Sequence, residues 1–220
     1  MKQLLLLVSL SLAACGGGNA AQSSSVVSVL PTTKPYVLTA IGDSITAGVK
    51  LPDPQNVWPF LVGRRAGIPV NDLAISGIDS IGAQTRELPD VPPNTTLAVV
   101  YLGSNDALAI AGGNATLASE ESAYRTIVTT LQGQGILVYT VQIRRWESNN
   151  PQVDVALAVD TNVNLLNAFV ATLPGTGKIT LDQYPDTYNP IYFDSQFLHP
   201  NDPGNALLAQ HIGDQISTIL

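Results

Sequence analysis

Four residues belong to the types that acyl transfer uses, and each lies in a short polar stretch. Acyl transfer needs an attacking hydroxyl, a base that takes its proton, and hydrogen-bond donors around the oxygen that becomes negative. Ser44 is the candidate hydroxyl and His199 the candidate base. The backbone N–H of Gly77 and the side-chain amide of Asn105 are candidate donors.

Each of these residues also has a structural interpretation when it is considered alone. Gly-Asp-Ser is common in turns, and Asn is a usual helix N-cap. Gly77 can be a plain loop glycine, and a single histidine is often buried and hydrogen-bonded without any catalytic role. The decision between the two interpretations therefore depends on the elements that position these residues.

Apolar runs with β-type composition alternate with stretches of helical spacing. The run LAVVYL at 97–102 is continuously apolar, which is typical of a parallel strand buried on both faces. This alternation predicts an α/β fold with three layers, α/β/α, around a parallel sheet. Strands are expected at 36–41, 70–75, 97–102, 136–141 and 178–181, and helices from Val57 and over 119–131, 155–173 and 205–220.

The candidate residues follow the predicted strands. Ser44 comes after the first strand, Gly77 after the second and Asn105 after the third, and His199 lies beyond the fifth. Ligands of such sheets bind beyond the carboxyl ends of the strands, so these residues are expected to converge on one site for acyl transfer. Ser44 is expected at a strand-to-helix turn, where N–H groups favour negative charge.

Four motifs occur in the order that is typical of one enzyme family. GDSITAG at 42–48, ISG at 75–77, GSND at 103–106 and HPN at 199–201 resemble the motifs of GDSL esterases and lipases, also called SGNH hydrolases. The resemblance extends from the first predicted strand to the last helix. It implies a five-stranded, flavodoxin-like sheet in the order 2-1-3-4-5. It also implies hydrolysis of carboxylic esters through an acyl-enzyme, without a metal or organic cofactor.

The same resemblance implies a role for each residue. Ser44 would be the nucleophile and His199 the general base. The oxyanion hole would consist of the backbone N–H groups of Ser44 and Gly77 and the side-chain amide of Asn105.

The sequence departs from the family pattern at the acid that orients the histidine. Family members usually carry D-x-x-H, but Gln196 occupies the aspartate position here, and Asp194 lies five residues before His199. We expect Asp194 to reach the imidazole through a longer turn, because a carboxylate is the usual third member of a triad. Two alternatives remain open. Gln196 or a backbone carbonyl orients the ring in a Ser–His dyad, or a distant acid such as Asp182 or Asp186 does so.

The N-terminus has the pattern of a bacterial lipoprotein. A short positive start and an apolar run too short to span a membrane precede Leu-Ala-Ala-Cys, which resembles a lipobox ending at Cys15. We expect a signal peptide at 1–14, a lipidated Cys15 with a flexible tether to residue 34, and the hydrolase domain at 35–220. This places the protein in the cell envelope, lipid-anchored to a membrane on the extracytoplasmic side. The alternative is an ordinary secretory signal with an incidental cysteine.

Composition excludes several classes of function. The net charge of −7 argues against nucleic acid as a partner, and the single cysteine leaves no disulfide. Two histidines and one cysteine are too few for a usual zinc site, so no metal is expected. The G-x-S-x-G elbow and the nucleotide-binding glycine motifs are absent from the sequence.

The function predicted from the sequence is a serine esterase of the cell envelope, whose substrate is a small-molecule ester, a lipid ester, an acylated sugar or a thioester. The alternative is a non-catalytic lipoprotein that binds carbohydrate or lipid on the same fold. Arg144, Arg145 and Trp146 follow the fourth strand and are interpreted as surface packing, with a substrate-binding wall as the other possibility. His211 lies beside the apolar face of the last helix and is interpreted as structural.

Overall fold

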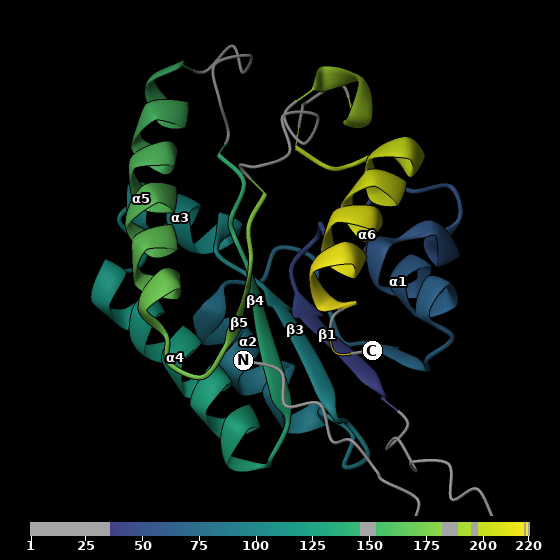
Figure 1. Cartoon of the computed structure of the whole chain (residues 1–220). Coiled ribbons are helices and arrows are strands. Elements are labelled where there is room, and N and C mark those ends of the chain that lie inside the picture. Colours follow the sequence, from purple (N-terminus) through teal and green to yellow (C-terminus); the bar gives the residue numbers. More distant parts are fainter. Residues whose placement is uncertain (1–35, 146–152, 182–188, 195–197, 218, 220) are drawn as a thin grey trace, which may run out of the picture. The chain divides into compact units, whose positions relative to one another are not determined.

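A computed structural model describes residues 36–145, 153–181, 189–194, 198–217 and 219, all within the unit that begins at Pro35. Five parallel strands form one sheet in the order β2-β1-β3-β4-β5, which confirms the predicted fold class and strand order (Figure 1). The strands are β1 (Leu38–Gly42), β2 (Val70–Asp72), β3 (Leu97–Tyr101), β4 (Leu137–Val141) and β5 (Gly177–Ile179).

Helices cover both faces of this sheet (Figure 1). The helices are α1 (Trp58–Ala66), α2 (Ser80–Arg86), α3 (Ser104–Ala111), α4 (Leu117–Gly133), α5 (Val153–Thr172) and α6 (Asp202–Ile216), with 3₁₀ turns η1 (Pro54–Asn56), η2 (Leu88–Asp90) and η4 (Pro190–Tyr192). The four predicted helices correspond to α1, α4, α5 and α6. The short helices α2 and α3 were not predicted, because seven or eight residues give little periodic signal.

Alternate residues of the central strands serve two separate cores. Leu97 and Val99 of β3 pack with α1 and α6, whereas Ala98 and Val100 of the same strand pack with α2, α4 and α5. Every residue of β1 and β3 is buried, as expected for central parallel strands with helices on both faces. The carboxyl ends of β1, β3 and β4 are thereby held side by side.

Most predicted boundaries differ from the structure by a few residues, and two of these differences have a clear local cause. Strand β2 ends at Asp72 because its carboxylate accepts a hydrogen bond from the N–H of Ala74 at 3.1 Å, which turns the chain locally. The N–H of Ile75 still donates to the carbonyl of Gly42 at 3.0 Å, so the segment continues beside β1. Helix α6 begins three residues earlier than predicted, where the Asn201 side chain accepts a hydrogen bond from the N–H of Gly204.

Candidate active site

Ser44 lies in a turn directly after β1, and the regular helix expected there does not form. The N–H of Ala47 donates to the carbonyl of Asp43 at 2.9 Å, which gives one helical turn. Gly48 and Lys50 then adopt left-handed backbone angles, with φ of 68° and 69°, and these angles end a right-handed turn. The first regular helix after this turn is α1, so the N–H groups near Ser44 come from a single turn.

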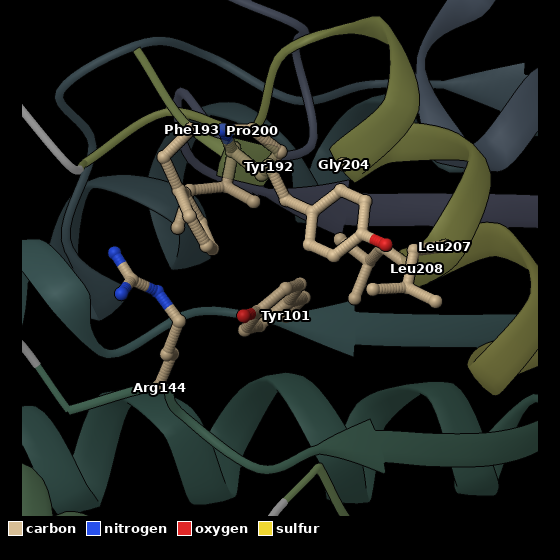
Figure 2. Close-up of a pocket in the computed structure, with 9 residues that line it drawn as sticks. Tyr101, Arg144, Tyr192, Phe193, Pro200, Gly204, Leu207 and Leu208 are labelled. Carbon is tan, nitrogen blue, oxygen red and sulfur yellow. The ribbon is translucent and has the colours of Figure 1, made fainter. Parts of the chain in front are cut away.

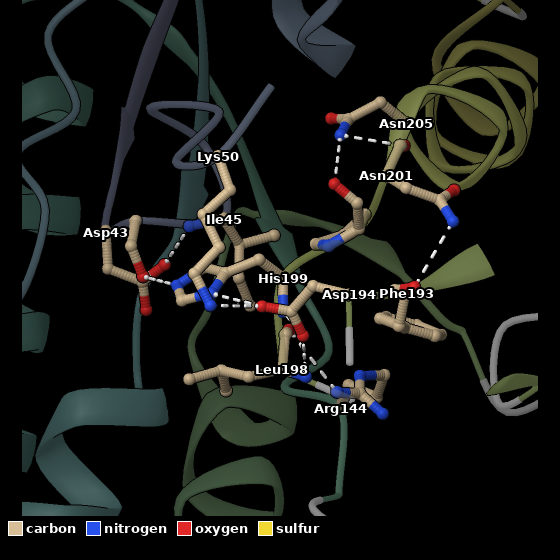
Figure 3. Close-up of polar contacts among 12 residues, drawn as sticks. Asp43, Ile45, Lys50, Arg144, Phe193, Asp194, Leu198, His199, Asn201 and Asn205 are labelled. Carbon is tan, nitrogen blue, oxygen red and sulfur yellow. Dashed lines mark hydrogen bonds and ion pairs between the residues drawn. The ribbon is translucent and has the colours of Figure 1, made fainter. Parts of the chain in front are cut away.

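His199 faces Ser44 across the site, although 155 residues separate them in the chain. Its Nε2 lies 3.0 Å from Oγ of Ser44, and its Nδ1 lies 3.3 Å from Oδ2 of Asp194. The same carboxylate oxygen accepts a hydrogen bond from Nζ of Lys50 at 2.6 Å (Figure 3). Serine, histidine and aspartate therefore form a continuous chain of contacts.

The charge state of Asp194 determines which tautomer of His199 fits this geometry. Burial alone would raise the pKa of Asp194, but hydrogen bonds from Lys50, the Leu198 N–H and His199 outweigh it and hold the pKa at about 2. An ionised carboxylate can only accept hydrogen bonds, so Nδ1 of His199 carries the proton. Nε2 of the neutral ring is then an acceptor for the hydroxyl of Ser44.

His199 itself is only slightly exposed, with 11% of its side chain accessible. Burial lowers its pKa below the ordinary value, because the charged imidazolium loses hydration. The contact with Asp194 raises the pKa and so opposes this effect, whereas the positive charges of Lys50 and Arg144 lower it further. The imidazole of His199 therefore stays neutral at lower pH than an ordinary histidine does.

The segment that carries His199 is anchored on both sides. Asn201 donates from its side chain to the carbonyls of Ile191 and Phe193, at 2.8 and 3.2 Å. Asn205 donates to the carbonyl of Pro200 and accepts from the N–H of Trp58 at 3.1 Å. The asparagine of the HPN motif thus serves to cap α6 and to fix the loop that carries the histidine.

Gly77 and Asn105 lie beyond β2 and β3, the two strands that flank β1. Nδ2 of Asn105 donates to the carbonyl of Ile78 at 2.9 Å, which holds its amide beside the Gly77 turn. Gly77 is exposed and has a φ of 78°, a conformation that side chains with a Cβ rarely adopt. Gly103 before α3 has a φ of 126°, and a Cβ there would collide with the side chain of Ile143.

Glu87 joins the chain segments that precede Ser44 and Gly77. Its Oε2 accepts from the N–H of Gly42 at 3.1 Å, and its Oε1 accepts from the N–H of Ile75 at 2.9 Å. The side chain is buried, and this burial raises its pKa to about 8. One carboxyl group thereby fixes the spacing between the two loops.

Buried carboxyl groups also hold the N-terminus of α2, which follows Gly77. Asp106 accepts hydrogen bonds from the N–H and hydroxyl of Ser80, and Glu120 accepts one from the N–H of Ile81 at 3.3 Å. Burial raises the pKa of both groups, to about 8 for Glu120. Asp43, beside Ser44, is also buried, which raises its pKa to about 7.

A cavity lies against the residues that follow Ser44 and His199. Ile45 and Pro200 contribute to its wall, and the space inside it that a water-sized molecule can reach is small, about 20 Å³. Arg144 is buried at its edge, with the guanidinium carbon 4.1 Å from the centre of the Phe193 ring (Figure 2). The surface packing of Arg144 predicted from the sequence is therefore wrong, because this side chain is inside a cavity wall. The remaining lining residues are Tyr101, Tyr192, Gly204, Leu207 and Leu208.

Several predicted residues lie outside the described part of the chain. These are Cys15, Trp146, Asp182, Asp186 and Gln196, together with the whole signal peptide and tether.

His211 is buried within α6, and its carbonyl accepts from Nε2 of Gln215. In the described ranges no group of three potential ligands is arranged to hold a metal ion. No described helix is both long and apolar enough to cross a membrane.

Sequence reasoning missed Lys50 and Glu87 as parts of this site. Lys50 contacts Asp194 across 144 residues, and Glu87 contacts Gly42 across 45 residues. No local motif marks either residue. Asp43 and Asp106 were inside the quoted motifs, so their positions in GDS and GSND were the available signal.

A comparison with protein families places most of the chain in one family. Residues 40–207 match the GDSL-like Lipase/Acylhydrolase family. A comparison with curated proteins gave no match.

Solved structures share the fold at low sequence identity. Phospholipase A1 from Streptomyces albidoflavus aligns with a TM-score of 0.67 and 14% identity, over 82% of this chain and 99% of that chain. The psychrotrophic esterase EstA from Pseudoalteromonas sp. aligns with a TM-score of 0.63 and 17% identity, over 83% and 97%. A catalytic mutant of an acetylxylan esterase from Geobacillus stearothermophilus aligns with a TM-score of 0.63 and 15% identity, over 82% and 94%.

Proposed function

Since the chain belongs to the GDSL-like lipase/acylhydrolase family, we propose that it hydrolyses carboxylic esters through an acyl-enzyme intermediate formed on Ser44. Family membership makes it an ester hydrolase of the GDSL type, and the assignment of roles to residues is our proposal. The observation that carries it is the 3.0 Å contact between Nε2 of His199 and Oγ of Ser44. This distance allows direct proton transfer from the hydroxyl to the imidazole.

The proposed reaction has two halves. In the first, His199 takes the proton of Ser44 while Oγ attacks the ester carbonyl, and the imidazolium then protonates the departing alcohol as the C–O bond breaks. In the second, His199 takes a proton from water while the water oxygen attacks the acyl carbonyl, and the imidazolium then protonates Oγ of Ser44 as the bond between Oγ and the acyl carbon breaks. This step releases the carboxylic acid and restores the hydroxyl of Ser44. Asp194 holds the ring and stabilises the imidazolium that forms in each half.

The proposed oxyanion hole combines donors from three neighbouring loops. Ser44 and Gly77 contribute backbone N–H groups, and Asn105 contributes its side-chain amide. An amide nitrogen carries two hydrogens, so Asn105 can bind the carbonyl of Ile78 and the oxyanion at the same time. Removal of one such donor typically costs about 2.7–4 kcal/mol of transition-state stabilisation.

We propose that the cavity beside the site receives the acyl group and favours short chains. The position of the cavity supports this proposal, since two of its lining residues, Ile45 and Pro200, directly follow the nucleophile and the base in the chain. Its wall is largely apolar, with Leu207 and Leu208 opposite Tyr101 (Figure 2). An apolar wall favours an acyl chain over the more polar alcohol portion of many esters.

We propose, from the sequence alone, that the enzyme is anchored in the bacterial cell envelope through a lipid on Cys15. Metabolic labelling with palmitate in a bacterial host tests this. Label should appear on the wild-type protein and be lost in Cys15→Ala. Equal labelling of both proteins would exclude lipidation at this residue.

The esterase proposal is tested with p-nitrophenyl acetate and longer p-nitrophenyl esters. Ser44→Ala should abolish turnover above the uncatalysed rate, because no other group replaces the nucleophile. Ser217→Ala is the matched control, since this serine is exposed in the last turn of the chain and should leave turnover unchanged. Turnover that survives in Ser44→Ala would exclude the serine mechanism.

A further inference from the structure

Lys50 contacts the same carboxylate oxygen that His199 uses. Its Nζ lies 2.6 Å from Oδ2 of Asp194, and Nδ1 of His199 lies 3.3 Å from that oxygen. Building on the proposed function, we infer that Lys50 is a positioning residue, which fixes Asp194 and shares its negative charge so that His199 remains a neutral base. Lys50 does not touch the reacting atoms in this role.

The hydrogen bonds of Asp194 show how Lys50 helps to fix the orientation of this carboxylate. Oδ1 accepts from the N–H groups of Leu198 and His199 at 3.1 and 3.4 Å, and Oδ2 accepts from Lys50 and the imidazole. Both oxygens are therefore held, and rotation of the carboxylate would break bonds on either side. The bond from Lys50 is the shortest of the four, so it contributes strongly to this orientation.

Lys50 joins two distant segments of the site. It ends the turn that carries Ser44, and Asp194 lies in the segment that leads to His199. The ion pair therefore forms a second connection between these segments, in addition to the contact between Ser44 and His199. The side chain of Lys50 is 48% exposed and that of Asp194 only 13%, so water screens the pair less than it screens a fully exposed one.

The backbone of Lys50 supports a role for its side chain. Among the described residues it is the one non-glycine position with positive φ, at 69°. A Cβ is disfavoured in this left-handed region, and Gly48 in the same turn adopts a nearly identical φ of 68°. Local strain of this kind is often retained where a side chain has a function.

The electrostatic consequence follows from the groups that face His199. Asp194 raises the pKa of the imidazole, whereas burial and the charges of Lys50 and Arg144 lower it. Lys50 acts twice, because its charge repels the imidazolium and its hydrogen bond occupies the acceptor that stabilises that cation. Removing the ammonium should therefore make His199 easier to protonate and move the acid limb of activity to higher pH.

Four variants of the full chain test this inference through the pH dependence of kcat/KM. Lys50→Met removes the charge and keeps the unbranched stem, Lys50→Gly also relieves the backbone, and Lys50→Arg keeps a cation. Arg65→Met is the matched control, since Arg65 forms an exposed ion pair with Asp214 at 2.7 Å.

The expected result is an acid limb that moves with the charge at position 50. Lys50→Met and Lys50→Gly should shift it upward by roughly half to one pH unit. Lys50→Arg and Arg65→Met should stay within about 0.2 units of wild type. An unshifted limb in Lys50→Met, or a shift in Lys50→Gly alone, would overturn the inference, because only backbone strain would then be involved. Thermal melting establishes that each variant is folded before it is assayed.

Titration of the two histidines by NMR provides a readout that needs no turnover. The chain contains His199 and His211 only, so a His211→Gln variant assigns the two imidazole signals. The pKa of His199 should rise in Lys50→Met, and that of His211 should stay constant as an internal control. If no ester is hydrolysed, the proposed function fails while this titration still decides the role of Lys50. An unchanged pKa of His199 would overturn that role even in an active enzyme.

Discussion

Oδ2 of Asp194 lies 3.3 Å from Nδ1 of His199, although the two residues are five positions apart. The backbone N–H of Asp194 also donates to the carbonyl of His199 at 2.9 Å, and Phe193 pairs with Pro200 as an antiparallel bridge. The two residues therefore face each other across the base of a closed loop. This pairing explains how an aspartate outside the D-x-x-H spacing reaches the imidazole.

Asp194→Asn should lower kcat by up to about 10⁴-fold, because the amide neither stabilises an imidazolium nor enforces the tautomer with a proton on Nδ1. Steady-state kinetics with a p-nitrophenyl ester measures this effect. Asp214→Asn, which changes an exposed ion pair away from the site, should have no effect. A loss below tenfold in Asp194→Asn, together with a large loss in Gln196→Ala, would assign the orienting role to Gln196.

Activity should persist at pH values below the ordinary pKa of histidine. Burial lowers the pKa of His199 from 6.5, so the neutral base is still populated in mildly acidic solution. As pH falls through the lowered pKa, the imidazole gains a proton and kcat/KM declines. A profile measured at constant ionic strength should place the acid midpoint below 6.5. A midpoint above this value would mean that Asp194 outweighs burial and the two cations.

Asn105→Ala should lower kcat by about 10²–10³-fold with little change in KM, because an oxyanion donor acts mainly in the transition state. The variant also loses the bond to the carbonyl of Ile78 at 2.9 Å. Asn162→Ala is a matched control. The amide of Asn162, in α5, donates at 3.2 Å to the carbonyl of Ala107, which lies in α3 together with Asn105. Comparable losses in both variants would indicate a structural role for Asn105.

Glu87 should make folding stability depend on pH in the neutral range. Its pKa is about 8 in the folded protein and 4.5 in the unfolded reference. Between these two pH values, the folded state therefore binds more protons than the unfolded state does. Stability is therefore fully present below about pH 4.5 and falls as pH rises through about 8, which denaturant titration of wild type measures. Burial of Asp43, with a pKa of about 7, acts in the same direction.

Glu87→Gln separates the effect of this group from the others. Glutamine cannot titrate, so the decline in stability between pH 5 and 9 should become shallower by about the contribution of one proton. The amide offers one acceptor in place of two, so either the Gly42 or the Ile75 N–H loses its partner and kcat should also fall. An unchanged slope would show that Glu87 is ionised throughout this range.

Local patterns in the sequence were enough to predict the class of fold and to select the residues of the candidate site. The buried run at 97–101 and its neighbours specify strands through local hydrophobicity, and helical spacing between them requires crossovers that make the sheet parallel. Ser44, Gly77, Asn105 and His199 were recognisable because each follows a strand and lies in a motif. These signals are local, so they can be read from short windows of sequence.

The side chains that support those residues could be identified only from the folded structure. The contacts of Lys50 with Asp194 and of Glu87 with Gly42 and Ile75 join segments whose separation depends on strand order and loop packing. The same holds for Asp194, whose reach depends on a loop closure that residue counting does not reveal. A hydrogen bond depends on the positions of two atoms within a few tenths of an ångström. No pattern within either segment contains that information, because it arises only when the sheet brings the segments together.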